Sequence, residues 1–241
     1  MPSADPSLTT TPGTVLTENP AHATWTSMDR TIGRRACQAF FVVSLAYVPA
    51  MLAGFAANGG FDKAIADPYL AVMELLIMVL AVPLVVVFAC VHAYAPANRK
   101  SLSLSALVLV ALTAGITVCV HLVLLTVGRQ ADAHTLPGYD LLLSWHWPSA
   151  VFALDIASWD FFLGFALLLA AAVFTHPGLP QLVRRGLQLS GALCLFGLVG
   201  AATGNMGLRD IGIVGYGVIL PVVLLAMARL FAATPVQETP R

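Results

Sequence analysis

The chain contains six apolar runs, each close to the ~20 residues that an α-helix needs to cross the hydrocarbon core of a membrane. They cover approximately residues 36–57, 70–94, 102–127, 156–176, 186–205 and 211–232. Hydrophobic residues make up 59% of the chain and charged residues only 10%, whereas a soluble domain carries about 25% charged residues. The sequence therefore predicts an all-α integral membrane protein, a bundle of six spanning helices.

The positive charges indicate how these six helices are oriented. If the spans alternate, one side of the membrane receives Arg30, Arg34, Arg35, Arg99, Lys100, Arg184, Arg185, Arg229 and Arg241, and the other side receives Lys63, Arg129 and Arg209. Lysine and arginine are enriched in cytoplasmic loops. We therefore expect both termini in the cytoplasm (N-in/C-in) and the protein in a bacterial-type cytoplasmic (inner) membrane, as a multi-pass protein.

The remaining segments flank or connect the spans. Residues 1–29 are rich in Thr, Pro, Ser and Ala, a composition typical of a disordered tail; we expect a cytoplasmic tail at 1–29, a six-span domain at 30–233 and a second cytoplasmic tail at 234–241. The longest connection, between the third and fourth spans, contains Leu141–Leu143 and Trp145–Trp147. Such a pattern favours a segment lying in the membrane interface over a seventh span.

Acidic residues next to or inside apolar runs are the main functional signal. Glu74 lies about four residues into the second span, and Asp160 about four residues into the fourth. His121 lies roughly 9 Å below the same surface of the membrane by helix rise. Ionisable groups within spans are costly and often functional. We expect these three side chains to share one layer near the outer face and to line a polar cavity.

Four further residues belong to this candidate ligand site: Asp155, Trp159, Asn205 and Arg209. We place Asn205 at the end of the fifth span and Arg209 just above the sixth. Asp155 has an alternative interpretation as a helix cap, and Trp159 has one as an interfacial anchor. The polar groups together also have a structural alternative, because such groups hold membrane helices to one another.

No cofactor is expected. His92 and His121 lie on consecutive spans but at opposite ends of them, roughly 20 Å apart or more by helix rise, so a single haem cannot use both. No metal-binding or phosphate-binding motif occurs, and the four cysteines are scattered without a C-x-x-C pair. The formal net charge of zero argues against nucleic acid as a partner.

The tracts LDIASWDFF (154–162) and GLRDIGIVGY (207–216) resemble those of small bacterial polytopic membrane proteins of unknown function. The resemblance covers roughly the C-terminal half and implies no activity.

Three functions stay open from the sequence alone. The first is a membrane protein that binds a small or lipophilic ligand in an outer-leaflet pocket, for transport, sensing or an accessory role. The second is a membrane-embedded enzyme acting on a lipid-soluble substrate, such as an isoprenoid cyclase with Asp160 or Glu74 as a carboxylic general acid. The third is a structural subunit that assembles as a homo- or hetero-oligomer through the small residues Gly200 and Gly204.

Overall fold

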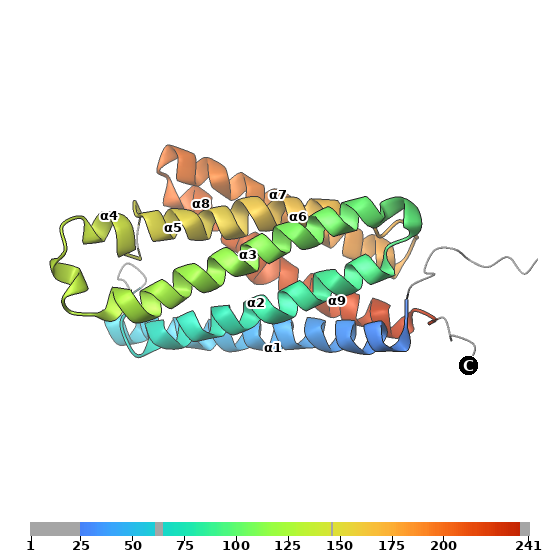
Figure 1. The fold of residues 1–241 in the computed structure, drawn as a ribbon, viewed down its shortest axis with the longest axis horizontal. Helices are drawn as coiled ribbons and strands as arrows, with labels where there is room; N and C mark the ends of the chain where they lie inside the picture. Colours follow the sequence, from blue (N-terminus) through green and yellow to red (C-terminus); the bar gives the residue numbers. More distant parts are fainter. Residues whose placement is uncertain (1–24, 61–64, 146, 237–241) are drawn as a thin grey trace, which may run out of the picture.

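A computed structural model describes residues 25–60, 65–145 and 147–236. Within these ranges all regular structure is helical, and six segments are long and apolar enough to span a membrane. They run side by side in an elongated bundle (Figure 1). The all-α six-helix prediction is therefore confirmed.

The first three spans are α1 (Ser27–Asn58), α2 (Tyr69–Tyr94) and α3 (Lys100–Thr126). The fourth consists of α5 (Ala150–Ile156), the π-helical segment η5 (Ala157–Phe162) and α6 (Leu163–Ala171). The fifth is α7 (Leu179–Thr203), and the sixth consists of α8 (Met206–Ile213), the π-helical segment η6 (Val214–Ile219) and α9 (Leu220–Ala233). The outward faces carry exposed apolar side chains such as Val42, Val82, Val108 and Val222, as expected of surfaces that face lipid.

The bundle has two chemically different ends. At one end, which we call the terminal end, the start of α1 and the end of α9 lie together (Figure 1), and the ring of Trp25 packs 5.1 Å from that of Phe231. Trp25 is fully buried, so the packed bundle includes residues before 30. The predicted tail residues 1–24 and 237–241 lie outside the described residues.

At the other end, which we call the pocket end, the connection between α3 and α5 contains the short helix α4 (Tyr139–Leu143) and two short 3₁₀ turns, Val127–Arg129 and Ala133–Thr135. Five residues rise about 7.5 Å in a helix, so α4 cannot span a membrane. Leu141 and Leu142 on α4 are exposed. Within the described part of the chain, this connection contains no seventh span.

Four helices begin at least five residues before their predicted starts, and side-chain caps account for three of them. The first span begins at Ser27, nine residues before the predicted residue 36, because the Thr26 side chain accepts a hydrogen bond from the Asp29 amide. The fourth span begins at Ala150 because the Ser149 hydroxyl accepts a hydrogen bond from the Phe152 amide at 3.2 Å. The sixth begins at Met206, since the Asn205 side chain accepts in the same way from Leu208. The fifth begins at Leu179, ahead of the predicted residue 186 and without a side-chain cap. Short polar side chains at such positions satisfy amides that the first helical turn leaves open.

Glycines allow α7 and α8 to approach each other closely. A Cβ atom on Gly200 would lie 2.1 Å from the Arg209 amide nitrogen, and one on Gly197 would lie 3.1 Å from the Arg209 carbonyl oxygen. Gly204 ends α7 in the left-handed conformation, with φ of 71°. Gly200 therefore packs within this chain, and assembly through Gly200 and Gly204 stays an untested prediction.

Candidate functional site

A continuous cluster of buried charged groups crosses the pocket-end half of the bundle. The His121 Nδ1 atom contacts the Glu74 carboxylate, and its Nε2 atom lies 3.3 Å from Asp155 Oδ1. Arg209 continues the cluster, with one terminal nitrogen 3.7 Å from Asp155 Oδ2 and Nε 3.6 Å from Asp160 Oδ2. All five residues are at most 5% exposed. Glu74, His121 and Asp160 therefore lie in one buried cluster, in which Asp160 reaches the other two only through Asp155 and Arg209.

The revised helix starts explain why Asp155 and Arg209 belong to this cluster. Asp155 lies six residues beyond the Ser149 cap, so it does not cap the helix and points into the bundle beside His121. Arg209 lies inside α8, one turn after its start, and not above the sixth span as the sequence suggested. Its guanidinium also packs over the Phe152 ring, 5.4 Å from the centroid. These two residues bridge the groups that the sequence had placed in one layer.

The two π-helical segments position the inner part of the cluster. In η5, which carries Asp160, the carbonyl oxygen of Ser158 accepts hydrogen bonds from the Leu163 amide and, at 3.2 Å, from the Thr113 hydroxyl. The Ser158 hydroxyl in turn donates to the Thr113 carbonyl at 2.9 Å. Hydroxyl groups on α3 thus hold η5 against it, and π-helical turns of this kind are frequent at functional sites.

The second π-helical segment follows the same pattern. In η6, the Gly215 carbonyl accepts from the Leu220 amide and from the Ser190 hydroxyl, the latter at 2.8 Å. Tyr216 on this segment accepts a hydrogen bond from Arg209 at 3.1 Å, and its ring packs 5.1 Å from that of Trp159. Arg209 is therefore held by both carboxylates, by an aromatic face and by a phenol.

Asp160 is the most enclosed acid of the cluster. It is 0% exposed, and neither of its carboxylate oxygens has a hydrogen-bond partner among the described residues. A Cβ atom on Gly212 would lie 2.2 Å from Asp160 Oδ1, so this glycine leaves the space that the carboxyl group occupies. The separation of 3.6 Å from Arg209 Nε is an ion-pair distance and too long for a hydrogen bond.

The charges of the described cluster do not balance. Glu74, Asp155 and Asp160 bring three acids, whereas Arg209 and a protonated His121 bring at most two positive charges. Full ionisation therefore leaves one negative charge in excess. An uncompensated buried charge is so costly that the group neutralises instead, and interacting acids share the proton that does so. The cluster accordingly requires a bound proton or cation.

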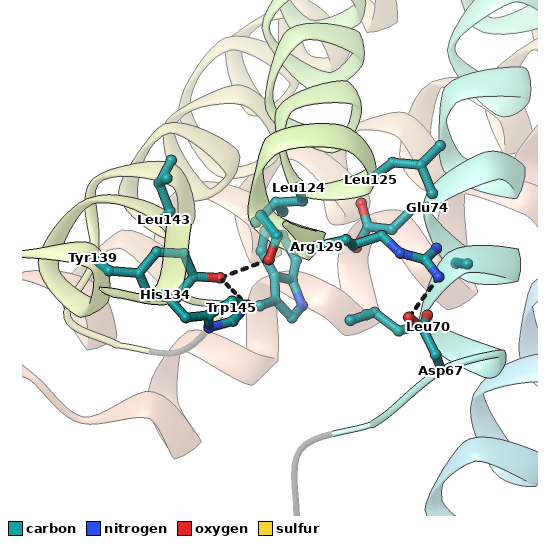
Figure 2. Close-up of a pocket in the computed structure, with 12 residues that line it drawn as sticks. Asp67, Leu70, Glu74, Leu124, Leu125, Arg129, His134, Tyr139, Leu143 and Trp145 are labelled. Atoms are coloured by element: carbon teal, nitrogen blue, oxygen red, sulfur yellow. Dashed lines mark hydrogen bonds and ion pairs between the residues drawn. The ribbon is translucent and has the colours of Figure 1, made fainter. Parts of the chain in front are cut away.

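A cavity of about 290 Å³ opens beside the cluster at the pocket end (Figure 2). Its walls come from α2, α3 and α4 and include Leu70, Leu124, Leu125, Leu143 and the ring of Trp145. Glu74 lines this cavity and is at the same time bound to His121. No other member of the five-residue cluster is among the described residues that line it. Glu74 is thus the link between the cavity and the buried charges.

Polar contacts order the mouth of the cavity. Figure 2 shows the Arg129 guanidinium turned toward Asp67, with a separation of 2.6 Å. On the opposite side the Tyr139 hydroxyl donates to the Gly128 carbonyl at 2.8 Å and lies 3.4 Å from His134 Nε2. Partial burial and the neighbouring Asp140 raise the pKa of Tyr139, so it remains a neutral phenol that ties α4 to the 3₁₀ turn after α3.

Two predicted site residues lie elsewhere. Asn205 is exposed, and its side chain caps α8. Trp159 is 2% exposed and packs on Tyr216 inside the bundle, so it is not an interfacial anchor; its indole nitrogen has no hydrogen-bond partner among the described residues. The sequence prediction also missed Tyr216, which contacts Arg209; its i+7 spacing, on the same helical face about two turns later, is a usable signal.

Comparisons with protein-family models, with curated proteins and with solved structures find no match to this chain.

Proposed function

We propose that this chain is a multi-pass membrane protein that binds a small ligand in the pocket-end cavity and links that binding to protonation of the buried cluster. One observation carries the proposal: Glu74 both lines the cavity and contacts His121. A ligand that changes the charge or hydrogen bonding of Glu74 therefore acts on Asp155, Arg209 and Asp160 beyond it. Such a link suits transport, sensing or an accessory role.

The charge distribution supports an orientation for this protein. Among the described residues, eight lysines and arginines lie at the terminal end: Arg30, Arg34, Arg35, Arg99, Lys100, Arg184, Arg185 and Arg229. In the described pocket-end loops, Arg129 is the one such residue. By the positive-inside rule, the terminal end faces the cytoplasm. We place the protein in a bacterial-type cytoplasmic membrane, with the cavity open to the outer side.

The proposal is tested by native mass spectrometry of protein purified in detergent. Wild type is expected to retain a small molecule that Glu74→Gln loses, because the substitution removes the carboxylate that faces the cavity. Asp132→Asn is the matched control, since Asp132 is an exposed acid at the same end and does not line the cavity. A mass retained equally by all three proteins, or by none of them, contradicts a ligand site at Glu74.

An enzyme acting on a lipid-soluble substrate is the second candidate function. The observation in its favour is that a carboxyl group, Glu74, and an aromatic ring, Trp145, line the same cavity, because a cyclase needs an acid and a face that stabilises a carbocation. This function predicts turnover of a polyisoprenoid that Glu74→Gln abolishes and Asp160→Asn, outside the cavity lining, retains. Cyclisation of such a substrate by purified protein is the assay; unchanged substrate contradicts it.

A further inference from the structure

Glu74 has an open position for a ligand. The side chain is 3% exposed, and its Oε2 atom is the one that contacts His121. Its second oxygen, Oε1, makes no hydrogen bond to the described residues and is not one of their enclosed, unpartnered polar atoms, so it is accessible from the cavity that the side chain borders. A ligand in the cavity can therefore reach this oxygen. Because a carboxylate oxygen accepts hydrogen bonds and attracts positive charge, it favours a ligand that brings a donor or a positive charge.

The other walls restrict what that ligand can be. The cation that lines the cavity, Arg129, is already paired with Asp67 at 2.6 Å, so Glu74 is left without a neutralising partner from the wall. The rings of Trp145 and Tyr139 also line the cavity. Aromatic faces attract cations, with tryptophan the strongest. The aliphatic remainder, including Leu124 and Leu125, fits an apolar body attached to the charge.

The charges of the cluster behind Glu74 also favour a positively charged ligand. The described cluster is negative by at least one charge when its acids are ionised, as counted above. A proton neutralises this excess negative charge when the cavity is empty of ligand, and a cation at Glu74 neutralises it equally well. An anion would add to the excess negative charge. A neutral molecule would leave it unchanged.

From these observations we infer that the cavity takes a small organic cation with an apolar body, and that the cation enters in exchange for the proton held by the cluster. The inference rests on the proposed ligand site and specifies its ligand class. One positive charge enters and one proton leaves to the solvent, so the net charge of the buried region stays constant. The volume of about 290 Å³ lies just below the usual range for small-molecule sites, about 300–1,000 Å³, so the ligand is small.

Several ionisable groups lie in or beside the cluster, and each packed element contributes. Glu74 itself interacts with Tyr47 on α1 and His121 on α3. Behind them lie Asp155 on α5, Asp160 on η5, Arg209 and Asp210 on α8 and Tyr216 on η6, and the cavity mouth carries Asp67 and Arg129. Because these groups are coupled, the exchanged proton belongs to the cluster and not to a single residue.

Isothermal titration calorimetry with three probes of one shape tests the inference. They are benzyltrimethylammonium, the neutral isostere neopentylbenzene and the anion phenylmethanesulfonate. Binding of the ammonium probe is expected to be strongest, and its affinity is expected to rise about tenfold per pH unit across the range in which one proton is released. Titrations in two buffers that differ in ionisation enthalpy count that proton directly.

Two variants locate the effect. Glu74→Gln is expected to weaken binding of the ammonium probe at least about tenfold and to remove its pH dependence, by loss of the charge-assisted contact. Leu125→Trp is expected to block all three probes by narrowing the cavity without altering its charge. If Glu74→Gln fails to fold, Leu125→Trp still tests whether the probes bind in this cavity. Asp132→Asn is expected to bind as wild type does.

Each other outcome has a defined meaning. Binding of the ammonium probe without proton release overturns the exchange. A preference for the neutral or anionic probe that Leu125→Trp abolishes overturns the cation class and leaves the proposed ligand site standing. Failure of all three probes also overturns the inference, whereas the proposed site then depends on the mass-spectrometric comparison of wild type with Glu74→Gln.

Discussion

The two ends of the bundle are held together by different physical chemistry. At the terminal end Trp25, Tyr94, Phe174 and Phe231 pack ring against ring, with centroid separations of 5.1–5.9 Å. At the pocket end, equally buried positions hold Glu74, His121, Asp155, Asp160 and Arg209. Aromatic packing serves stability at any pH. Buried charges that do not balance contribute little to stability. Stability alone therefore does not account for their presence, which favours a functional role for them.

Removal of the cluster's cation is expected to have the largest effect. Arg209→Met leaves Asp155 and Asp160 without their positive partner, and breaking a buried ion pair in this way costs about 3–5 kcal/mol. The loss is expected to shrink as pH falls, because protonation neutralises the stranded carboxylates. Phe231→Leu at the terminal end is the comparison and should cost the same at every pH. Unfolding by SDS titration at several pH values measures both; equal pH dependence of the two variants contradicts the distinction between the ends.

A methyl group at the contact between α7 and α8 is expected to have the next largest effect. In Gly200→Ala the new Cβ atom meets the Arg209 backbone nitrogen at 2.1 Å, and overpacking of this kind costs about 1–3 kcal/mol. Gly207→Ala is the control, since its Cβ atom meets only Asn205 Oδ1 at 3.4 Å. The same unfolding assay applies. If Gly200→Ala is as stable as Gly207→Ala, the two helices do not pack as closely as described.

Removal of an acid from the same cluster is expected to matter less than removal of its cation. Asp160→Asn deletes the charge that is in excess, and its oxygens have no hydrogen bond to lose among the described residues. The free energy of unfolding at neutral pH should therefore change by less than about 1 kcal/mol, the worth of a typical neutral hydrogen bond. A loss as large as that of Arg209→Met would show that the charges balance after all.

The hydroxyl contacts to the π-helical segments should give the smallest changes. Ser158→Ala and Ser190→Ala each remove a hydrogen bond of the kind that averages about 0.6 kcal/mol between membrane helices. Ser158 supports the segment that carries Asp160 and Ser190 the one that carries Tyr216. Both variants should unfold slightly more easily in the SDS assay. Losses of several kcal/mol would mean that these segments fold only with the hydroxyls in place.

The sequence predicted the six-helix bundle well because the length of an apolar run depends on the thickness of the bilayer alone. It predicted the roles of Asp155 and Arg209 less well, because polar N-cap residues start the helices that carry them six positions earlier in α5 and five in α8. The signals at Ser149 and Asn205 were present as N-cap residues. The π-helical segments were not predictable, since hydroxyls on neighbouring helices stabilise their carbonyls and no local pattern encodes those contacts.

The protonation state of the buried acids tests the account most directly. Infrared difference spectroscopy of the purified protein detects the C=O stretch of a protonated carboxyl group, and ¹³C-labelled aspartate distinguishes Asp155 and Asp160 from Glu74. We predict such a band at neutral pH in the ligand-free protein, its loss when benzyltrimethylammonium binds, and its loss without ligand in Asp160→Asn. A ligand-free protein with no protonated carboxyl group, or a band indifferent to the bound cation, would contradict the charge deficit on which the proposed function depends.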